Sequence, residues 1–384
     1  MIFAQIGSKG LDLGANILMS HIDSPHLDFK VHPLYEDDGL ALLKTHYYGG
    51  IKKYQWPTIN LAIHGKVFLA NGKSVDIKIG EKENDPVFMI TDLLPHLDKN
   101  DNGTTNQSGK VTGEQLNLVV GNIPVSDNNV KERVKLAILE YLFEEYGIKE
   151  ADLMSTDLQA VPSEKARDLG FDRSMISAYG HDDKVCSYPS LMSLIDSKVS
   201  EKTQVCILID REEIGSDGIS GAKSAFIEVF FSDLLRLLGK ESGFEEVFRV
   251  FSNSEGISSD VTVAADPDYK DVLDARHSHK LSYGIIIEKY TGSGGKYSSS
   301  EASASYIQKL RMLFDKSGIV YDIGGGLGKI DVGGGGTIAK YMANRNIEIV
   351  DVGVPVLNMH APLEIISKAD LYSAYLAYKE FLVN

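Results

Sequence analysis

The chain has 384 residues, enough for two domains with a core each, and it is 43% hydrophobic and 24% charged. Its 54 acidic residues outnumber 39 lysines and arginines, which gives a formal net charge of −15 and argues against nucleic acid as a partner. No apolar run approaches the ~18 residues of a membrane helix, and the first ten residues do not resemble a secretion signal. Cys186 and Cys206 lie in separate apolar segments, as buried free thiols do in a reducing compartment. We therefore expect a cytoplasmic protein with no membrane partner.

The first predicted element is an apolar strand that ends in polar side chains, residues 15–24, ANILMSHIDS. Because strand side chains alternate between faces, His21 and Asp23 are expected to project to the same side. They would then lie at the carboxyl edge of a strand, where open α/β sheets bind ligands. The alternative interpretation of this stretch is a histidine that a local carboxylate hydrogen-bonds at the start of a loop.

Residues 26–162 have the pattern of a β-rich domain inserted into the chain. Runs of alternating polar and apolar residues flank Asn71-Gly72, a dipeptide that favours a tight hairpin. Apolar residues between Val134 and Leu142 recur at helical spacing, which predicts an amphipathic helix. We interpret Trp56 as a packing anchor of this domain.

Residues 163–384 alternate between predicted strands and helices. The predicted strands are residues 203–210, 281–290 and 347–357, and the predicted helices are residues 221–239 and 367–382. This alternation predicts an α/β fold with a mostly parallel central sheet flanked by helices. We assign residues 1–25 and 163–384 to that domain.

Four more clusters of polar residues lie beside apolar segments, as His21 and Asp23 do. They contain Asp182 with Asp183, Glu212 with Glu213, Asp260, and His360. Imidazoles and carboxylates without a thiolate suit zinc, manganese or cobalt. One metal ion would use three or four of these groups, whereas two ions sharing a bridging carboxylate would use five and leave one carboxylate as a base. Each cluster alone is typical of a solvated turn or a helix cap, but together they predict a metal centre.

The order of these clusters and their amino-acid sequences resemble those of the zinc aminopeptidases typified by aspartyl aminopeptidase and yeast vacuolar aminopeptidase I. The resemblance follows the bacterial branch over nearly the whole chain, through motifs such as SHIDSPHLDFK, GHDDKVC, REEIGSDGISGAKS, SSDVTVAADPDY and NMHAP. It implies a zinc-peptidase catalytic domain and an inserted domain, residues 26–162, that serves dimerisation and oligomerisation.

The resemblance also implies a role for each cluster in a centre of two Zn²⁺ ions per subunit, with Co²⁺ or Mn²⁺ as alternatives. His21 and Asp260 would bind one ion, His360 and Glu213 the other, and Asp182 would bridge both. Asp23 would orient His21, and Glu212 would be the general base that takes a proton from a metal-bridging water. The peptide bond between Asp182 and Asp183 is expected to be cis.

Further roles that the resemblance implies concern the substrate and the assembly. His96 would reach the active site of a neighbouring subunit, in an oligomer expected to be a dodecamer built from dimers. Gly335 and Thr337 lie in a segment that lines the specificity pocket in family members. Lys289 and Lys296 would lie where relatives bind acidic side chains, although solvated lysines are the simpler interpretation. We interpret His277 and His279 as parts of an exposed loop.

The resemblance implies an aminopeptidase that removes an acidic or neutral N-terminal residue from peptides. Two alternatives stay open at this point, a dinuclear zinc amidohydrolase or deacylase and a non-catalytic oligomeric scaffold. Glu212 argues against the scaffold, since a scaffold has no need of a base. Hydrolysis of aminoacyl anilides but not of N-acetyl amino acids would separate the two enzyme classes.

Overall fold

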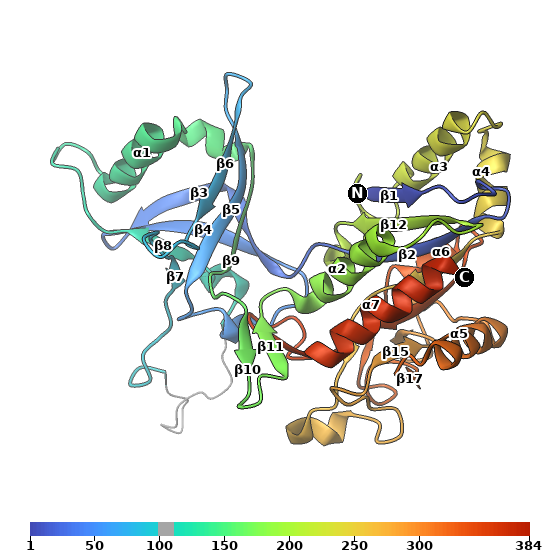
Figure 1. Cartoon of the computed structure of the whole chain (residues 1–384). Coiled ribbons are helices and arrows are strands. Elements are labelled where there is room, and N and C mark those ends of the chain that lie inside the picture. The colour runs from blue at the N-terminus through green and yellow to red at the C-terminus, as the bar shows by residue number, and fades with distance from the viewer. Residues whose placement is uncertain (99–110) are drawn as a thin grey trace. The chain divides into compact units, whose positions relative to one another are not determined.

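The computed structural model describes residues 1–98 and 111–384, which divide into two compact units (Figure 1). The first unit consists of Met1–Ser24, Arg167–Met359 and Leu363–Asn384. The second consists of Pro25–Ala166 and His360–Pro362. Among the described residues, no helix has both the length and the apolar character needed to span a lipid bilayer.

A seven-stranded sheet forms the centre of the first unit, with the strand order β1-β12-β2-β13-β19-β15-β17. Pairing is parallel from β12 through β2 and β13 to β19 and again between β15 and β17, and it is antiparallel for β1–β12 and β15–β19. The strands are β1 (Ile2–Gln5), β2 (Ala15–His21), β12 (Thr203–Ile209), β13 (Glu255–Ser258), β15 (Ile285–Glu288), β17 (Tyr321–Gly324) and β19 (Glu348–Gly353).

Helices cover both faces of this sheet, and each face has its own apolar core. One core joins the sheet to α2 (His181–Asp196), α5 (Ala304–Ser317) and α7 (Lys368–Val383). The other joins it to α3 (Phe226–Leu237), α4 (Phe244–Ser252) and α6 (Ala339–Ala343). Strand β2 contributes Leu18 to the first core and Ile17 and Met19 to the second, because successive side chains point to opposite faces.

Two smaller sheets and two short 3-10 helices complete the first unit. A five-stranded sheet has the order β10-β11-β21-β20-β14, and β16 pairs with β18. Their bounds are β10 (Arg167–Leu169), β11 (Met175–Ala178), β14 (Thr262–Val263), β16 (Gly292–Ser293), β18 (Gly334–Gly335), β20 (Pro355–Leu357), β21 (Glu364–Ser367), η4 (Glu212–Ile214) and η5 (Pro267–Val272).

The second unit contains an antiparallel sheet of the order β6-β5-β9-β3-β4-β8-β7, together with the helix α1 (Arg133–Tyr146). Trp56 is fully buried in its core. The other elements are β3 (His26–Asp37), β4 (Leu40–Tyr48), β5 (Leu61–Phe68), β6 (Ser74–Ile79), β7 (Met89–Ile90), β8 (Leu118–Gly121), β9 (Thr156–Pro162), η1 (Lys53–Gln55), η2 (Gly113–Gln115) and η3 (Glu150–Met154).

Several sequence predictions are confirmed by these elements. The chain has a mixed α/β fold, a helix covers the predicted region from Val134 to Leu142, and Trp56 is a core residue. Strands β5 and β6 form a hairpin whose turn contains Gly72 with φ of +81°, a conformation that favours glycine. Both cysteines are buried free thiols.

Candidate metal centre

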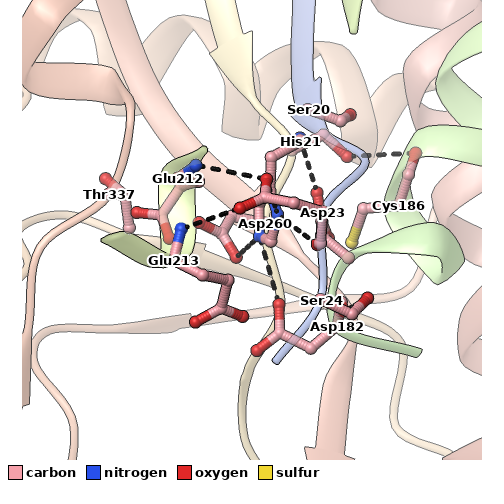
Figure 2. A network of polar contacts seen from close by, with 12 residues as sticks. Ser20, His21, Asp23, Ser24, Asp182, Cys186, Glu212, Glu213, Asp260 and Thr337 are labelled. Atoms are coloured by element: carbon pink, nitrogen blue, oxygen red, sulfur yellow. Dashed lines mark hydrogen bonds and ion pairs between the residues drawn. The ribbon is translucent and has the colours of Figure 1, made fainter. Parts of the chain in front are cut away.

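His21 is the last residue of β2, and both of its ring nitrogens have acidic or carbonyl partners (Figure 2). Its Nε2 lies 3.1 Å from an Asp182 carboxylate oxygen and 3.8 Å from one of Asp260. Its Nδ1 lies 2.9 Å from the backbone oxygen of Asp23 and 3.3 Å from a carboxylate oxygen of the same residue. A proton on Nδ1 therefore leaves the Nε2 lone pair directed at the two aspartates.

The described residues bring four ligand atoms together around His21. One atom each from His21, Asp182, Asp183 and Asp260 lies within 4.8 Å of the others. Carboxylate oxygens of Asp182 and Glu213 also lie within that distance of each other. Asp182 therefore belongs to the group around His21 and also lies close to Glu213. Asp182 and Asp183 are in the first turn of α2, Asp260 follows β13, and Glu213 lies in η4.

Asp23 contacts η4 as well as His21. One carboxylate oxygen accepts the backbone N–H of Glu212 and the other that of Glu213, both at 3.1 Å. These N–H groups belong to the first turn of a helix, where no backbone acceptor is available. Asp23 therefore fixes the segment that carries Glu212, and Figure 2 shows Glu212 and Glu213 beside the His21–Asp260 contact.

The electrostatics of the site reflect its burial and its excess of carboxylates. Burial lowers the pKa of His21, but Asp182, Asp23 and Asp260 outweigh it and raise that pKa well above its usual value. Burial raises the pKa of Asp183 well above its usual value and also raises the pKa of Asp260. Burial, with the charge of Asp260, raises the pKa of Glu212 to about 8. A bound cation would reverse these effects on the carboxylates by favouring their charged form.

Backbone packing positions Asp260. A Cβ atom at Gly353, the last residue of β19, would lie 1.6 Å from the Asp260 carbonyl oxygen, so only glycine fits there. Two residues before Gly353, Asp351 accepts a hydrogen bond from Thr337 Oγ1 at 3.0 Å. This bond ties Thr337 to β19 at the same end of the strand.

The predicted substrate residues belong to the first unit. Gly335 pairs with Gly292 across β18 and β16. Lys289 and Lys296 both form ion pairs with Glu301, at 3.5 and 3.0 Å, and the Lys296 ammonium lies 3.9 Å from the centre of the Tyr290 ring. Their predicted contact with substrate stays a prediction.

His360 and His96 belong to the second unit. His360 has a φ of +65°, and its Nδ1 lies 2.9 Å from the carbonyl oxygen of Gly50. His96 is exposed in a turn. The roles expected for these two histidines stay predictions.

From the sequence, Asp183 was part of a predicted cluster but received no role, and the environment of His279 was misjudged. Asp183 is fully buried, and its carboxylate accepts the backbone N–H of His21 at 3.2 Å, a role that no local pattern reveals. The peptide bond between Asp182 and Asp183 is cis, as expected. The interpretation of His279 as exposed was wrong, because its ring is buried between carboxylates of Glu288 at 3.5 Å and Asp322 at 3.2 Å.

The donor set fits a metal ion. It combines one imidazole nitrogen with carboxylate oxygens, the ligands that zinc, manganese and cobalt accept. Buried carboxylates this close to one another repel unless a cation neutralises them, and a divalent ion would do so.

Comparison with known proteins identifies the family. The pattern of the family "Aminopeptidase I zinc metalloprotease (M18)" matches residues 1–382. The probable M18 family aminopeptidase 1 of Borrelia garinii subsp. bavariensis is 46% identical over 381 residues, which are 99% of this chain and 83% of that protein.

Solved structures have the same fold. The crystal structure of an M18-family aminopeptidase from Thermotoga maritima is 45% identical, with a TM-score of 0.93 over 100% of this chain and 86% of that chain. The structure of the mApe1 dodecamer of S. cerevisiae is 19% identical, with a TM-score of 0.76 over 99% of this chain and 82% of that chain, a likeness of fold alone. The chain therefore belongs to the M18 family of aminopeptidase I zinc metalloproteases, and it is a metallo-aminopeptidase.

Proposed function

We propose that this aminopeptidase holds two zinc ions per subunit and hydrolyses the peptide bond after an acidic or neutral N-terminal residue. The observation that carries the proposal is the group of ligand atoms from His21, Asp182, Asp183 and Asp260 within 4.8 Å of one another. The nearness of Asp182 to Glu213 supports a second metal position that shares Asp182.

The proposed ligand set is the one that the resemblance to zinc aminopeptidases implies, and the nearness of Asp182 to Glu213 supports it. His21 and Asp260 would hold one ion, Glu213 and His360 would hold the other, and Asp182 would serve both. Cobalt or manganese suits the same ligands. Asp23 supports His21 through Nδ1 and supports Glu212 through the backbone of η4.

The protein groups divide the chemical work. Zinc, when bound, supplies the charge that lowers the pKa of a water molecule and polarises the scissile carbonyl. Glu212 accepts a proton from the attacking water and donates it to the leaving amine. His96 of a neighbouring subunit helps to stabilise the transition state. The α-amine of the substrate binds beside the carboxylates, which restricts cleavage to the first residue.

The remaining proposals concern substrate choice, assembly and location. Lys289, Lys296, Gly335 and Thr337 contact the N-terminal side chain of the peptide. The domain of residues 26–162 mediates self-association into dimers and, from these, a dodecamer. We propose that the enzyme acts on peptides in the cytoplasm, without nucleic acid or membrane partners.

The substitution Glu212→Gln tests the function. It keeps the shape of the side chain but removes the base, so kcat on aminoacyl anilides should fall by about 10²–10⁴-fold. Zinc content measured by mass spectrometry should stay at two ions per subunit. Retained turnover would refute the assigned base, and a wild-type protein that binds one ion would refute the dinuclear centre.

A further inference from the structure

We propose that Ser24, Lys184 and Glu364 are positioning residues that clamp the backbone of Asp182, so that its carboxylate meets His21. The inference rests on the proposed role of Asp182 as a metal ligand, and it assigns a task to three residues outside the ligand set. All the residues concerned belong to the first unit.

The backbone of Asp182 requires such a clamp because it is not helical. Asp182 and Asp183 lie in the first turn of α2, with φ and ψ of −77° and 103° at Asp182. The N–H groups in the first turn of a helix have no partner within the helix, and a residue outside the helical conformation cannot direct its carbonyl along the helix either. A buried residue must therefore find other partners for both groups, and Asp182 is only 4% exposed.

Side chains from two other segments, the loop after β2 and the strand β21, supply these partners. The Asp182 N–H donates to a carboxylate oxygen of Glu364, the first residue of β21, at 3.0 Å. The Asp182 carbonyl accepts a hydrogen bond from Ser24 Oγ at 2.6 Å. Glu364 and Ser24 are 1% and 5% exposed, so water does not compete readily for either bond.

Lys184 completes the clamp. Its ammonium donates to Ser24 Oγ at 2.8 Å, which leaves the hydroxyl proton of Ser24 for the Asp182 carbonyl. Lys184 is exposed as a residue, but its side chain reaches inward, and burial of the ammonium lowers its pKa despite the nearby carboxylates. Gly180 makes room for this contact, because a Cβ there would lie 3.0 Å from both Lys184 Nζ and Ser24 Oγ.

The clamp and the metal ligands share the same two segments. Ser24 lies three residues after His21, and Asp183 accepts the His21 N–H, so the end of β2 and the start of α2 are joined at His21 as well as at Ser24. Loss of the clamp should therefore move the Asp182 carboxylate relative to His21 without unfolding either segment.

The test uses Ser24→Ala with Ser254→Ala as its matched control. Ser254 is also buried, and its hydroxyl also makes two hydrogen bonds, donating to Val250 O at 2.7 Å and accepting Ala15 N–H at 2.9 Å at the opposite end of β2. Both variants lose the same kind of contact, so a purely structural role predicts equal effects.

The main readouts are the zinc dissociation constant and the visible absorption spectrum of the Co²⁺-substituted enzyme. Ser24→Ala should bind zinc about tenfold more weakly, as expected for a loss of about 1.4 kcal/mol, and should shift the Co²⁺ bands. Ser254→Ala should keep the zinc dissociation constant within twofold of the wild-type value and should leave the Co²⁺ spectrum unchanged. The metal-free forms of the two variants should have similar thermal stability.

Substitutions at two further residues keep the inference falsifiable if Ser24→Ala fails to fold. Lys184→Met should weaken zinc binding about threefold, and Lys184→Arg should restore it because a donor returns. Glu364→Gln keeps an acceptor for the Asp182 N–H and should bind zinc better than Glu364→Ala.

The outcomes separate this inference from the proposed function. Equal zinc affinity and an unchanged Co²⁺ spectrum in Ser24→Ala, Lys184→Met and the wild type would overturn the clamp while leaving the dinuclear centre standing. A wild-type protein that binds no metal would instead overturn the proposed function.

Discussion

At the scale of single residues, the site depends on side chains that serve two elements at once. Asp23 is the clearest example, since its backbone oxygen lies nearest to His21 Nδ1 while its carboxylate accepts two N–H groups of η4. The second contact joins residues 189 positions apart in the sequence. No local pattern reveals it, and only the role of Asp23 toward His21 could be expected from the sequence.

Asp23→Asn should therefore affect catalysis more than metal binding. The substitution keeps the backbone oxygen that is nearest to His21, but an amide accepts only one of the two η4 N–H groups. We expect kcat to fall about tenfold, as for a loss of one charge-assisted hydrogen bond of about 1.5 kcal/mol, with zinc affinity within threefold of the wild type. An equal fall in zinc affinity and in kcat would contradict this division of roles.

Glu255 gives a pH-dependent contribution to stability far from the metal ligands. Burial alone would raise the pKa of Glu255, but the ammonium groups of Lys309, at 2.6 Å, and Lys202, at 3.3 Å, outweigh it and hold that pKa below its usual value. Because the folded-state pKa is depressed, the stabilisation is complete above the unfolded pKa and is lost as the pH falls through the folded pKa.

Glu255→Gln should thus be less stable than the wild type by about 1 kcal/mol at pH 7, and the difference should vanish in acid. Urea unfolding at a series of pH values measures it. Glu245→Gln is the control, because Glu245 pairs with Arg249 on the exposed surface of α4, where an ion pair contributes little. A difference in stability that does not change with pH would contradict the contribution assigned to Glu255.

At the scale of elements, sequence periodicity predicted individual strands and helices, but not the backbone contacts between them. The apolar run before His21 and the helical spacing after Val134 were sufficient because each is a local signal. His279 was misjudged because its neighbours in sequence are charged, whereas the carboxylates that contact its buried ring come from β15 and β17. Asp183 received no role for the same reason, since its partner is the N–H of His21.

Gly353→Ala tests a contact between elements that the sequence does not reveal. The added Cβ would collide with the Asp260 carbonyl oxygen, so the backbone after β13 must move. We expect zinc affinity to fall at least tenfold, a change of about 1.4 kcal/mol, in competition with a chromophoric chelator. Gly256→Ala on β13 is the control, because its Cβ would meet the Ile349 side chain at 3.1 Å and the Ile17 carbonyl oxygen at 3.4 Å, neither of which belongs to a proposed metal ligand. Equal affinities in the two variants would contradict the argument.

At the scale of the whole molecule, the two units have separate cores, and four of the five proposed metal ligands belong to the first unit. The only tryptophan of the chain, Trp56, is buried in the second unit. Tryptophan fluorescence therefore reports on the second unit, whereas circular dichroism in the far ultraviolet reports on both.

Removal of metal by a chelator should lower the melting temperature seen by circular dichroism by about 5–10 °C, as expected for an ion present at about 100 times its dissociation constant. The shift of the fluorescence transition should be smaller, because fewer of the proposed ligands lie in the second unit. Addition of zinc should restore both transitions. Identical melting curves with and without chelator would contradict a bound metal in the folded protein.

Strand β2 is buried along its whole length, and its side chains alternate between the two cores up to His21. A one-residue insertion or deletion within Ala15–His21 would exchange the sets of side chains that face each core and would also turn the histidine away from its aspartates. Insertions and deletions within this strand should therefore abolish activity. The exposed turn at Asn71-Gly72 has no such constraint, and it is where a purification tag or a fused peptide can be inserted.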